Sequence, residues 1–285
     1  MQKLRTSKDD PATASTDEII ETLLVESGAS KRLPTDADTL LEFLGLKQLS
    51  FDFMNEEAEF LEGGSNTATA NVRAVLSVNE RLVAVQPGLG QKRIKFSVLH
   101  EIGHFIMPEH RDRLFLDTDE TLSWRTKIRL EREANQAAAD LLFQGYRFTD
   151  ESLDREVSIQ TILELAPRFG ASYEAALRRF AERHVLACAV IVYDKVARTN
   201  ETDFEDDIYR VQYTVTSEPF RNKFFARVQT TQESLPGPEL YKPKAWGGIV
   251  TQQLTVEGGQ SDLVFDTEVF SNGYKIFQLI TRPAD

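Results

Sequence analysis

The stretch Phe96–Met107 reads FSVLHEIGHFIM and contains an H-E-x-x-H motif at residues 100–104. On a helix, side chains four residues apart share a face, so His100 and His104 could bind one metal ion together. Glu101 follows the first histidine, where a carboxylate can polarise a metal-bound water and act as general base. The alternative at this point is an amphipathic helix with two partly buried histidines.

The motif is predicted to lie on a helix that begins near Gln91 and ends at Pro108. Its apolar residues recur every three or four positions, which would bury one side and leave the histidines facing a cleft. Gly103 costs the helix about 1 kcal/mol relative to alanine. Either another element packs closely against the backbone at this glycine, or glycine occurs here by chance.

A catalytic zinc ion usually has three protein ligands, so the motif is one ligand short. A second helix, predicted over residues 123–144, offers Glu131 and Glu133. Their side chains point about 200° apart around the helix axis. We favour Glu131, because Asn135 lies one turn further along the same face and could hydrogen-bond a ligand. The alternative, that both glutamates are ordinary solvated charges, stays open.

Two further residues carry reactive side chains. His110 follows the metal helix closely. It could stabilise an oxyanion at the rim of the site, although we favour a surface histidine. Cys188 lies in the apolar run 186–193, which predicts a buried structural thiol rather than a nucleophile.

Composition narrows the class of protein. The net charge of −12 argues against a general nucleic-acid binder, although a local basic patch stays open. A single cysteine excludes an intramolecular disulfide framework and fits a reducing compartment. No apolar run approaches the ~20 residues of a membrane span. The N-terminal sequence MQKLRTSKDDPATAST lacks the apolar core of a signal peptide. We therefore expect a soluble, cytoplasmic protein without a membrane partner.

The remaining chain alternates helical and strand patterns, as in an α+β protein with two or three domains. Short alternating runs over 47–85 predict a small sheet, whose edge could hold an extended peptide. Residues 148–151 are predicted to be a short linker, and 158–180 a helix, a turn and a helix. From residue 185 onward, strand patterns predict a mixed sheet with one or two helices, one of them near 217–228.

The HEIGH motif together with EREANQAAADLL at residues 131–142 resembles the ImmA/IrrE metallopeptidase family, whose pattern is HExGH and then E-x-x-A-N-x-x-A-x-x-L-L. The resemblance implies a gluzincin-like site in which His100, His104 and Glu131 bind Zn²⁺ and Glu101 is the base. Mn²⁺ would suit the same two histidines and one carboxylate.

One departure from the family concerns packing. Many members have phenylalanine where this chain has Ala137, which changes no ligand. The resemblance also implies a layout in three parts after a disordered tail: tail 1–15, metallopeptidase domain 16–148, helix-turn-helix-like domain 149–184 and GAF-like sensor domain 185–285. The GAF-like domain would be the place for a small-molecule ligand.

Within the family, the sequence is most similar to the radiation and desiccation response regulators of Deinococcus. That similarity implies a site-specific endopeptidase whose protein partner is a helix-turn-helix repressor of the kind called DdrO. Its cleavage would induce DNA-damage response genes. One alternative is a transcription regulator that binds promoter DNA through residues 158–180 and holds a structural metal. Another is a signal-sensing adaptor without catalysis.

Overall fold

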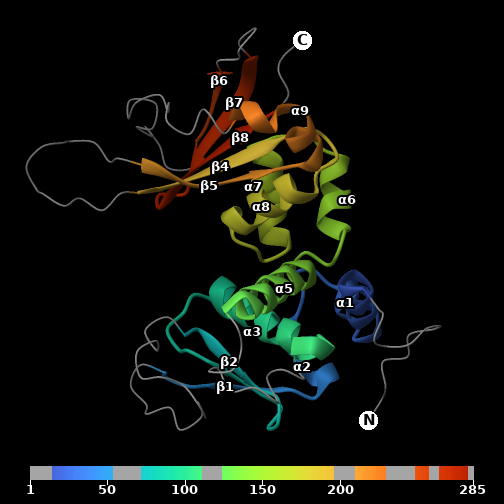
Figure 1. Cartoon of the computed structure of the whole chain (residues 1–285). Helices are drawn as coiled ribbons and strands as arrows, with labels where there is room; N and C mark the ends of the chain where they lie inside the picture. Colours follow the sequence, from blue (N-terminus) through green and yellow to red (C-terminus); the bar gives the residue numbers. More distant parts are fainter. Residues whose placement is uncertain are drawn as a thin grey trace, which may run out of the picture. The chain divides into compact units, whose positions relative to one another are not determined.

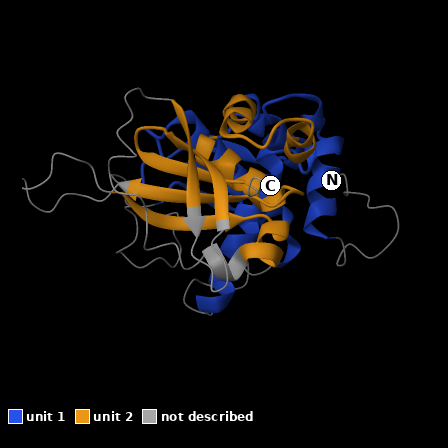
Figure 2. Ribbon diagram, turned by 90° about the horizontal axis from the view of Figure 1, so that it is seen from above, with its two compact units in different colours: residues 1–147, 168–171 blue, residues 148–167, 172–285 orange. Residues whose placement is uncertain are grey.

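The computed structural model describes residues 15–53, 72–110, 124–195, 209–228, 248–256 and 263–281. The chain forms two compact units, coloured separately in Figure 2. Unit 1 comprises residues 1–147 and 168–171, and unit 2 comprises residues 148–167 and 172–285. Of the predicted tail, only Ser15 is described, and it caps the first helix. Among the described helices, none has both the length and the apolar character needed to cross a membrane.

Unit 1 begins with short helices whose ends follow local capping chemistry. Ser15 and Glu18 form a reciprocal capping box at the start of α1, and Gly45 ends α2 with a φ of 66°. A small sheet follows, in the order β1-β3-β2, with β1 parallel and β2 antiparallel to β3. The bounds of these elements are α1 (Thr16–Glu26), η1 (Ala29–Lys31), α2 (Ala37–Leu44), β1 (Lys47–Ser50), β2 (Ala74–Ser77) and β3 (Leu82–Val85).

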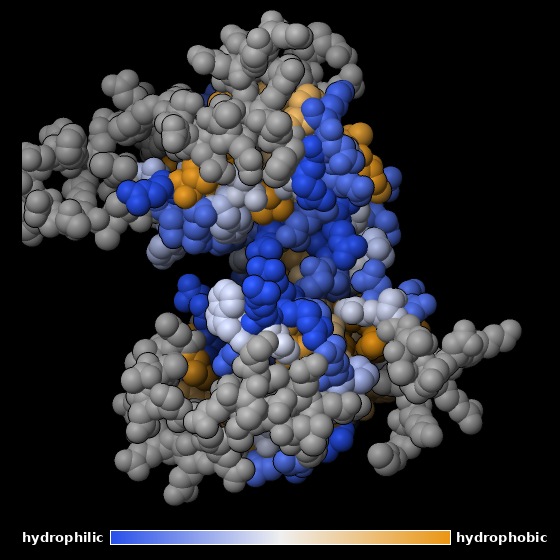
Figure 3. All heavy atoms as spheres, viewed as in Figure 1, coloured by the Kyte–Doolittle hydropathy of each residue, from blue (hydrophilic) through white to orange (hydrophobic). Residues whose placement is uncertain are grey.

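The two long helices predicted from the sequence are confirmed as α3 (Gln91–Ile106) and α5 (Trp124–Leu142). Helix α3 packs against β2 and β3 as well as against α5 (Figure 1). Helix α5 buries a face of small and aliphatic residues, including Ala134, Ala137 and Leu141. Its described surface on the face drawn in Figure 3 is mainly hydrophilic. The amphipathic pattern therefore places one side of α5 on α3 and leaves the other to solvent.

Gly103 lies where α3 and α5 approach each other closely. A Cβ atom added there would stand 3.0 Å from the carbonyl oxygen of Ala134 and 3.1 Å from the Cβ of Ala137. Neither atom can rotate away, because one belongs to the backbone and the other is bonded directly to it. The glycine therefore has a packing reason, which the sequence left open.

We expect Gly103→Ala to lower the free energy of unfolding by up to about 2 kcal/mol. Overpacking costs about 1–3 kcal/mol, more than the gain of about 1 kcal/mol in helix propensity. Urea denaturation of the single variants and of Gly103→Ala/Ala137→Gly measures the coupling. Relief of the close contact should make the double variant more stable than the sum of the single changes predicts. Simple additivity would contradict the packing explanation.

Unit 2 begins with three helices: α6 (Arg147–Leu153), α7 (Ile159–Arg168) and α8 (Tyr173–Arg183). The predicted linker at 148–151 is wrong, because these residues are helical. Their polar composition resembles a loop, but Phe148 is fully buried and Ser152 is buried on the same helix. The helix-turn-helix arrangement is confirmed, with Ser172 accepting a hydrogen bond from the backbone of Ala175 at the start of α8. The division into domains at 148 and 184 stays a prediction.

In the described part of unit 2, five strands form a sheet in the order β5-β4-β8-β7-β6. All its pairings are antiparallel, so the predicted mixed sheet is wrong. Phe220 and Phe224 of α9 pack into one cluster with Phe265. On the opposite face, Tyr173 of α8 packs edge-on against Phe270. The strands β4 and β8 are buried on both faces for this reason. The elements are β4 (Ala189–Lys195), β5 (Tyr209–Thr216), α9 (Glu218–Val228), β6 (Ile249–Val256), β7 (Leu263–Ser271) and β8 (Lys275–Ile280).

Cys188 is fully buried before β4, as the apolar run predicts. Burial raises the pKa of this thiol from 9.0 to about 12, against a smaller lowering by its hydrogen bond with Ser217. The unfolded chain loses the thiol proton first as pH rises. The contribution of Cys188 to stability is therefore complete below pH 9.0 and lost as pH rises toward about 12.

We expect iodoacetamide at pH 8 to leave Cys188 unmodified in the folded protein and to label it after urea unfolding. A pKa three units higher reduces the thiolate fraction about 1,000-fold, and burial also blocks access. Mass spectrometry at successive times measures the labelling. Labelling of the folded protein at the rate of the unfolded chain would show an accessible, reactive thiol.

Candidate metal centre

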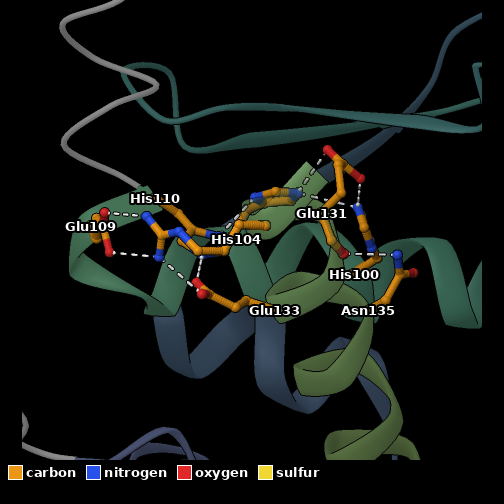
Figure 4. A network of polar contacts seen from close by, with 8 residues as sticks. His100, His104, Glu109, His110, Glu131, Glu133 and Asn135 are labelled. Carbon is orange, nitrogen blue, oxygen red and sulfur yellow. Dashed lines mark hydrogen bonds and ion pairs between the residues drawn. The ribbon is translucent and has the colours of Figure 1, made fainter. Parts of the chain in front are cut away.

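His100 and His104 lie one turn apart on α3, and Glu131 faces them from α5 (Figure 4). The Nε2 atoms of the two histidines are 3.2 Å apart. The Glu131 carboxylate places one oxygen 3.3 Å from His100 Nε2 and the other 3.6 Å from His104 Nε2. The structure thus brings together the three residues that the sequence singles out as ligands.

These three side chains could hold a metal ion, since their ligand atoms all lie within 4.8 Å of one another. Ligands about 2.0–2.1 Å from a tetrahedral zinc ion are about 3.3 Å apart. The observed separations of 3.2, 3.3 and 3.6 Å agree with that value. The side chain of Glu131 is 50% exposed, whereas the histidines are largely buried. The group therefore opens to solvent on the side of α5.

The charges at this centre favour an ionised carboxylate beside two imidazoles. The neighbouring imidazoles of His100 and His104 hold the pKa of Glu131 far below its usual range. Burial by itself lowers the pKa of His100, but the hydrogen bond to Glu131 and the charges of Glu101 and Glu131 outweigh it and raise the pKa. The same negative potential would attract a divalent cation.

Glu101 is buried on α3, with only 8% of its surface exposed. Burial raises the pKa of its carboxyl group, while the nearby His100 and His104 lower it by a smaller amount. A backbone hydrogen bond at Leu76 of β2 also lowers this pKa. Glu101 is therefore a desolvated carboxyl group beside the two imidazoles, a setting typical of a general base.

Asn135 supports the centre from α5. Its side-chain nitrogen donates a hydrogen bond of 2.8 Å to the backbone carbonyl of Glu131, one turn earlier. Its side chain also raises the pKa of His100 through a hydrogen bond. Asn135 thus supports the Glu131 backbone, as expected for a partner one turn further along α5 (Figure 4).

His110 is not the surface histidine that we favoured from the sequence. It is fully buried, in a helical stretch that includes residues 108–110. Its Nδ1 atom lies 3.1 Å from His104 Nδ1, and its Nε2 atom lies 2.8 Å from the Glu133 carboxylate. Burial lowers the pKa of His110, and the hydrogen bond to Glu133 opposes this. Glu133, the glutamate we did not choose as a ligand, thus contacts a histidine behind the centre.

The sequence contains little indication that His110 and Glu133 lie together behind the candidate metal centre. A third histidine close behind the motif in a chain with four histidines was the only hint. Glu133 is also held by Arg129, whose Nη1 atom lies 2.9 Å from its second oxygen, and Arg129 pairs with Glu109. Only the packing of α5 on α3 brings Glu133 and His110 together.

Comparison with known proteins identifies part of the chain. Residues 64–181 match the family model of the IrrE N-terminal-like domain, a peptidase family. The chain carries an IrrE N-terminal-like domain. The resemblance to the ImmA/IrrE family is thereby confirmed, and a metallopeptidase type of function is supported. The match contains the H-E-x-x-H motif and Glu131, so the candidate metal centre belongs to the IrrE N-terminal-like domain.

Similarity outside this family model is limited to fold. A search of curated proteins found no match. Among solved structures, a transcriptional regulator from Mycobacterium tuberculosis aligns with 93% of this chain and 75% of its own, at a TM-score of 0.54 and 14% identity. That identity supports a shared fold and nothing about activity.

We expect the protein to bind Zn²⁺, and Glu131→Gln to weaken the affinity at least about 100-fold. Loss of a direct ligand should exceed the about 10–100-fold effect of a partner that only orients one. Competition with a coloured chelator measures the affinity. Glu182→Gln, which removes a carboxylate paired with Arg178 in unit 2, is the control and should bind as the wild type does. Equal affinity in both variants would exclude Glu131 as a ligand.

Proposed function

We propose that this chain is a zinc-dependent endopeptidase. The observation that carries the proposal is the group formed by His100, His104 and Glu131, with Glu101 buried beside the two imidazoles. Two histidines and a carboxylate, with one side open to solvent, are the ligand set of a hydrolytic rather than a structural zinc site. The arrangement is gluzincin-like, because the third ligand comes from a later helix.

A bound zinc ion would lower the pKa of a coordinated water toward ~7 and polarise the scissile carbonyl. The protein supplies the proton transfers. Glu101 accepts the proton of the attacking water and delivers it to the leaving amine as the peptide bond breaks. Its desolvated position suits this exchange, because burial brings its pKa closer to neutrality. Mn²⁺ fits the same donors and is the alternative metal.

The substrate in this proposal is a helix-turn-helix repressor of the DdrO kind. The support is the resemblance to the IrrE (PprI) regulators of Deinococcus around residues 100–124. A peptidase domain implies a protein substrate. The similar Mycobacterium protein is named a transcriptional regulator, which is compatible with a role in gene control. Cleavage of the repressor would induce genes for the response to DNA damage and radiation.

The accessory parts of the proposal concern unit 2. We place a helix-turn-helix-like domain at 149–184 and a GAF-like sensor domain at 185–285. The helix-turn-helix geometry of α7 and α8 supports the first. The antiparallel sheet, with helices on both faces, supports the second. A small molecule bound in the sensor domain would regulate cleavage.

The alternative of promoter binding gains little from the structure. A DNA-reading helix presents the side chains of its first turn to base edges. In α8, Tyr173 packs against Phe270, and the Glu174 carboxylate accepts hydrogen bonds from Tyr213 and Lys275. The first turn of α8 is therefore engaged within unit 2 and carries a negative charge.

We expect Glu101→Gln to slow cleavage of the purified repressor about 10²–10⁴-fold, the usual contribution of a general base. Its Zn²⁺ affinity should stay within about 10-fold of the wild type, because Glu101 is not a ligand in this mechanism. The assay incubates enzyme and repressor with Zn²⁺ or Mn²⁺ and identifies products by mass spectrometry. Undiminished cleavage by the metal-loaded variant would refute the role of Glu101. No fragments with wild-type enzyme and either metal would favour the regulator alternative.

A further inference from the structure

Behind His104, three contacts form a chain that leads away from the candidate metal centre. His104 Nδ1 faces His110 Nδ1 at 3.1 Å, and His110 Nε2 faces a Glu133 oxygen at 2.8 Å. The other Glu133 oxygen accepts a hydrogen bond of 2.9 Å from Arg129. His104 and His110 are both buried, so water does not compete along most of this chain.

Which atom donates at one of these contacts determines which atom donates at the next. A carboxylate only accepts, so the nitrogen of His110 that faces Glu133 must carry a proton. In a neutral ring the other nitrogen, Nδ1, is then an acceptor. The facing Nδ1 of His104 must therefore donate and carry its own proton. In a neutral His104 ring this leaves Nε2 unprotonated, with its lone pair directed toward His100 and Glu131.

The opposite assignment makes the contact between His110 and Glu133 unfavourable and blocks the metal-binding nitrogen of His104. If His110 carried its proton on Nδ1, its bare Nε2 would face the Glu133 carboxylate at 2.8 Å, with two acceptors and no proton between them. His104 would then accept on Nδ1 and carry its proton on Nε2, where it could not bind a metal.

We propose that Glu133, acting through His110, fixes the tautomer and ring orientation of His104, so that its Nε2 lone pair is ready for the metal before the metal arrives. Glu133 and His110 are positioning residues, because neither contacts the metal or the substrate. Arg129 holds the Glu133 carboxylate in place and leaves one oxygen for His110. The inference rests on the proposed function, which makes His104 a zinc ligand. It adds Glu133 and His110 as residues that position this ligand.

The direct test is nitrogen-15 NMR of histidine-labelled full-length protein without metal. The chain has only four histidines, so each ring can be assigned. The proposal expects His104 protonated at Nδ1 and bare at Nε2, and His110 the reverse. In Glu133→Gln, which keeps the shape but loses the obligatory acceptor, the His104 tautomers should become mixed. A merely structural Glu133 would leave the tautomer unchanged. His104 protonated at Nε2 in the wild type would overturn the proposal without any variant.

Metal affinity provides the second readout. We expect Glu133→Gln and His110→Phe each to weaken Zn²⁺ binding about 10–100-fold, as loss of a ligand's outer partner usually does. The matched control is Glu164→Gln, which removes a similarly exposed glutamate paired with an arginine at 3.0 Å in unit 2. It should bind Zn²⁺ as the wild type does.

The outcomes separate this proposal from the proposed function. A wild-type protein that binds no Zn²⁺ refutes the metallopeptidase, whatever the NMR shows. A wild type that binds Zn²⁺, with unchanged affinity and tautomer in Glu133→Gln, refutes only the positioning role. Reduced affinity together with mixed tautomers in Glu133→Gln supports it.

Discussion

The close packing of α3 and α5 is the constraint on which the candidate site depends. Neither helix contains a complete ligand set, because two donors lie on α3 and the third on α5. Gly103 lies one residue before His104 and lets the backbone of α5 approach α3 to near contact. A larger residue would push the helices apart and move Glu131 away from the imidazoles. Glycine lowers the intrinsic stability of α3, but it allows the close approach that places Glu131 beside the imidazoles.

The interface also carries the electrostatics of the centre. Glu101 and Glu131 lie beside His100 and His104, and Glu133 lies beside His110, which contacts His104. The three carboxyl groups differ in exposure and in their partners. Glu101 is buried, Glu131 faces solvent opposite the imidazoles, and Glu133 is neutralised by Arg129. One residue type can therefore supply a base, a ligand and an anchor, because burial and partners set the chemistry of each.

Unit 2 is organised by a different principle, burial of a sheet on both faces. Within its buried strands, Tyr193 donates to Gln278, and Gln278 donates to Thr267. These polar side chains satisfy one another's hydrogen bonds within the buried strands. The contacts of α8 with the same sheet engage its first turn, and this distinguishes it from a helix that reads DNA.

The sequence by itself determined the elements of the candidate site. Spacing four residues apart placed His100 and His104 on one face, and the geometry of a helix separated Glu131 from Glu133. Local chemistry also predicted the two long helices and the buried thiol. Prediction from composition was wrong for the short polar stretch 148–151. These residues form a helix because Phe148 is buried against the rest of the fold. The sequence could not predict that His110 is buried or that Gly103 is needed for close helix packing. Both depend on contacts with α5 that join residues more than twenty positions apart in the sequence, and only the tertiary packing decides those contacts.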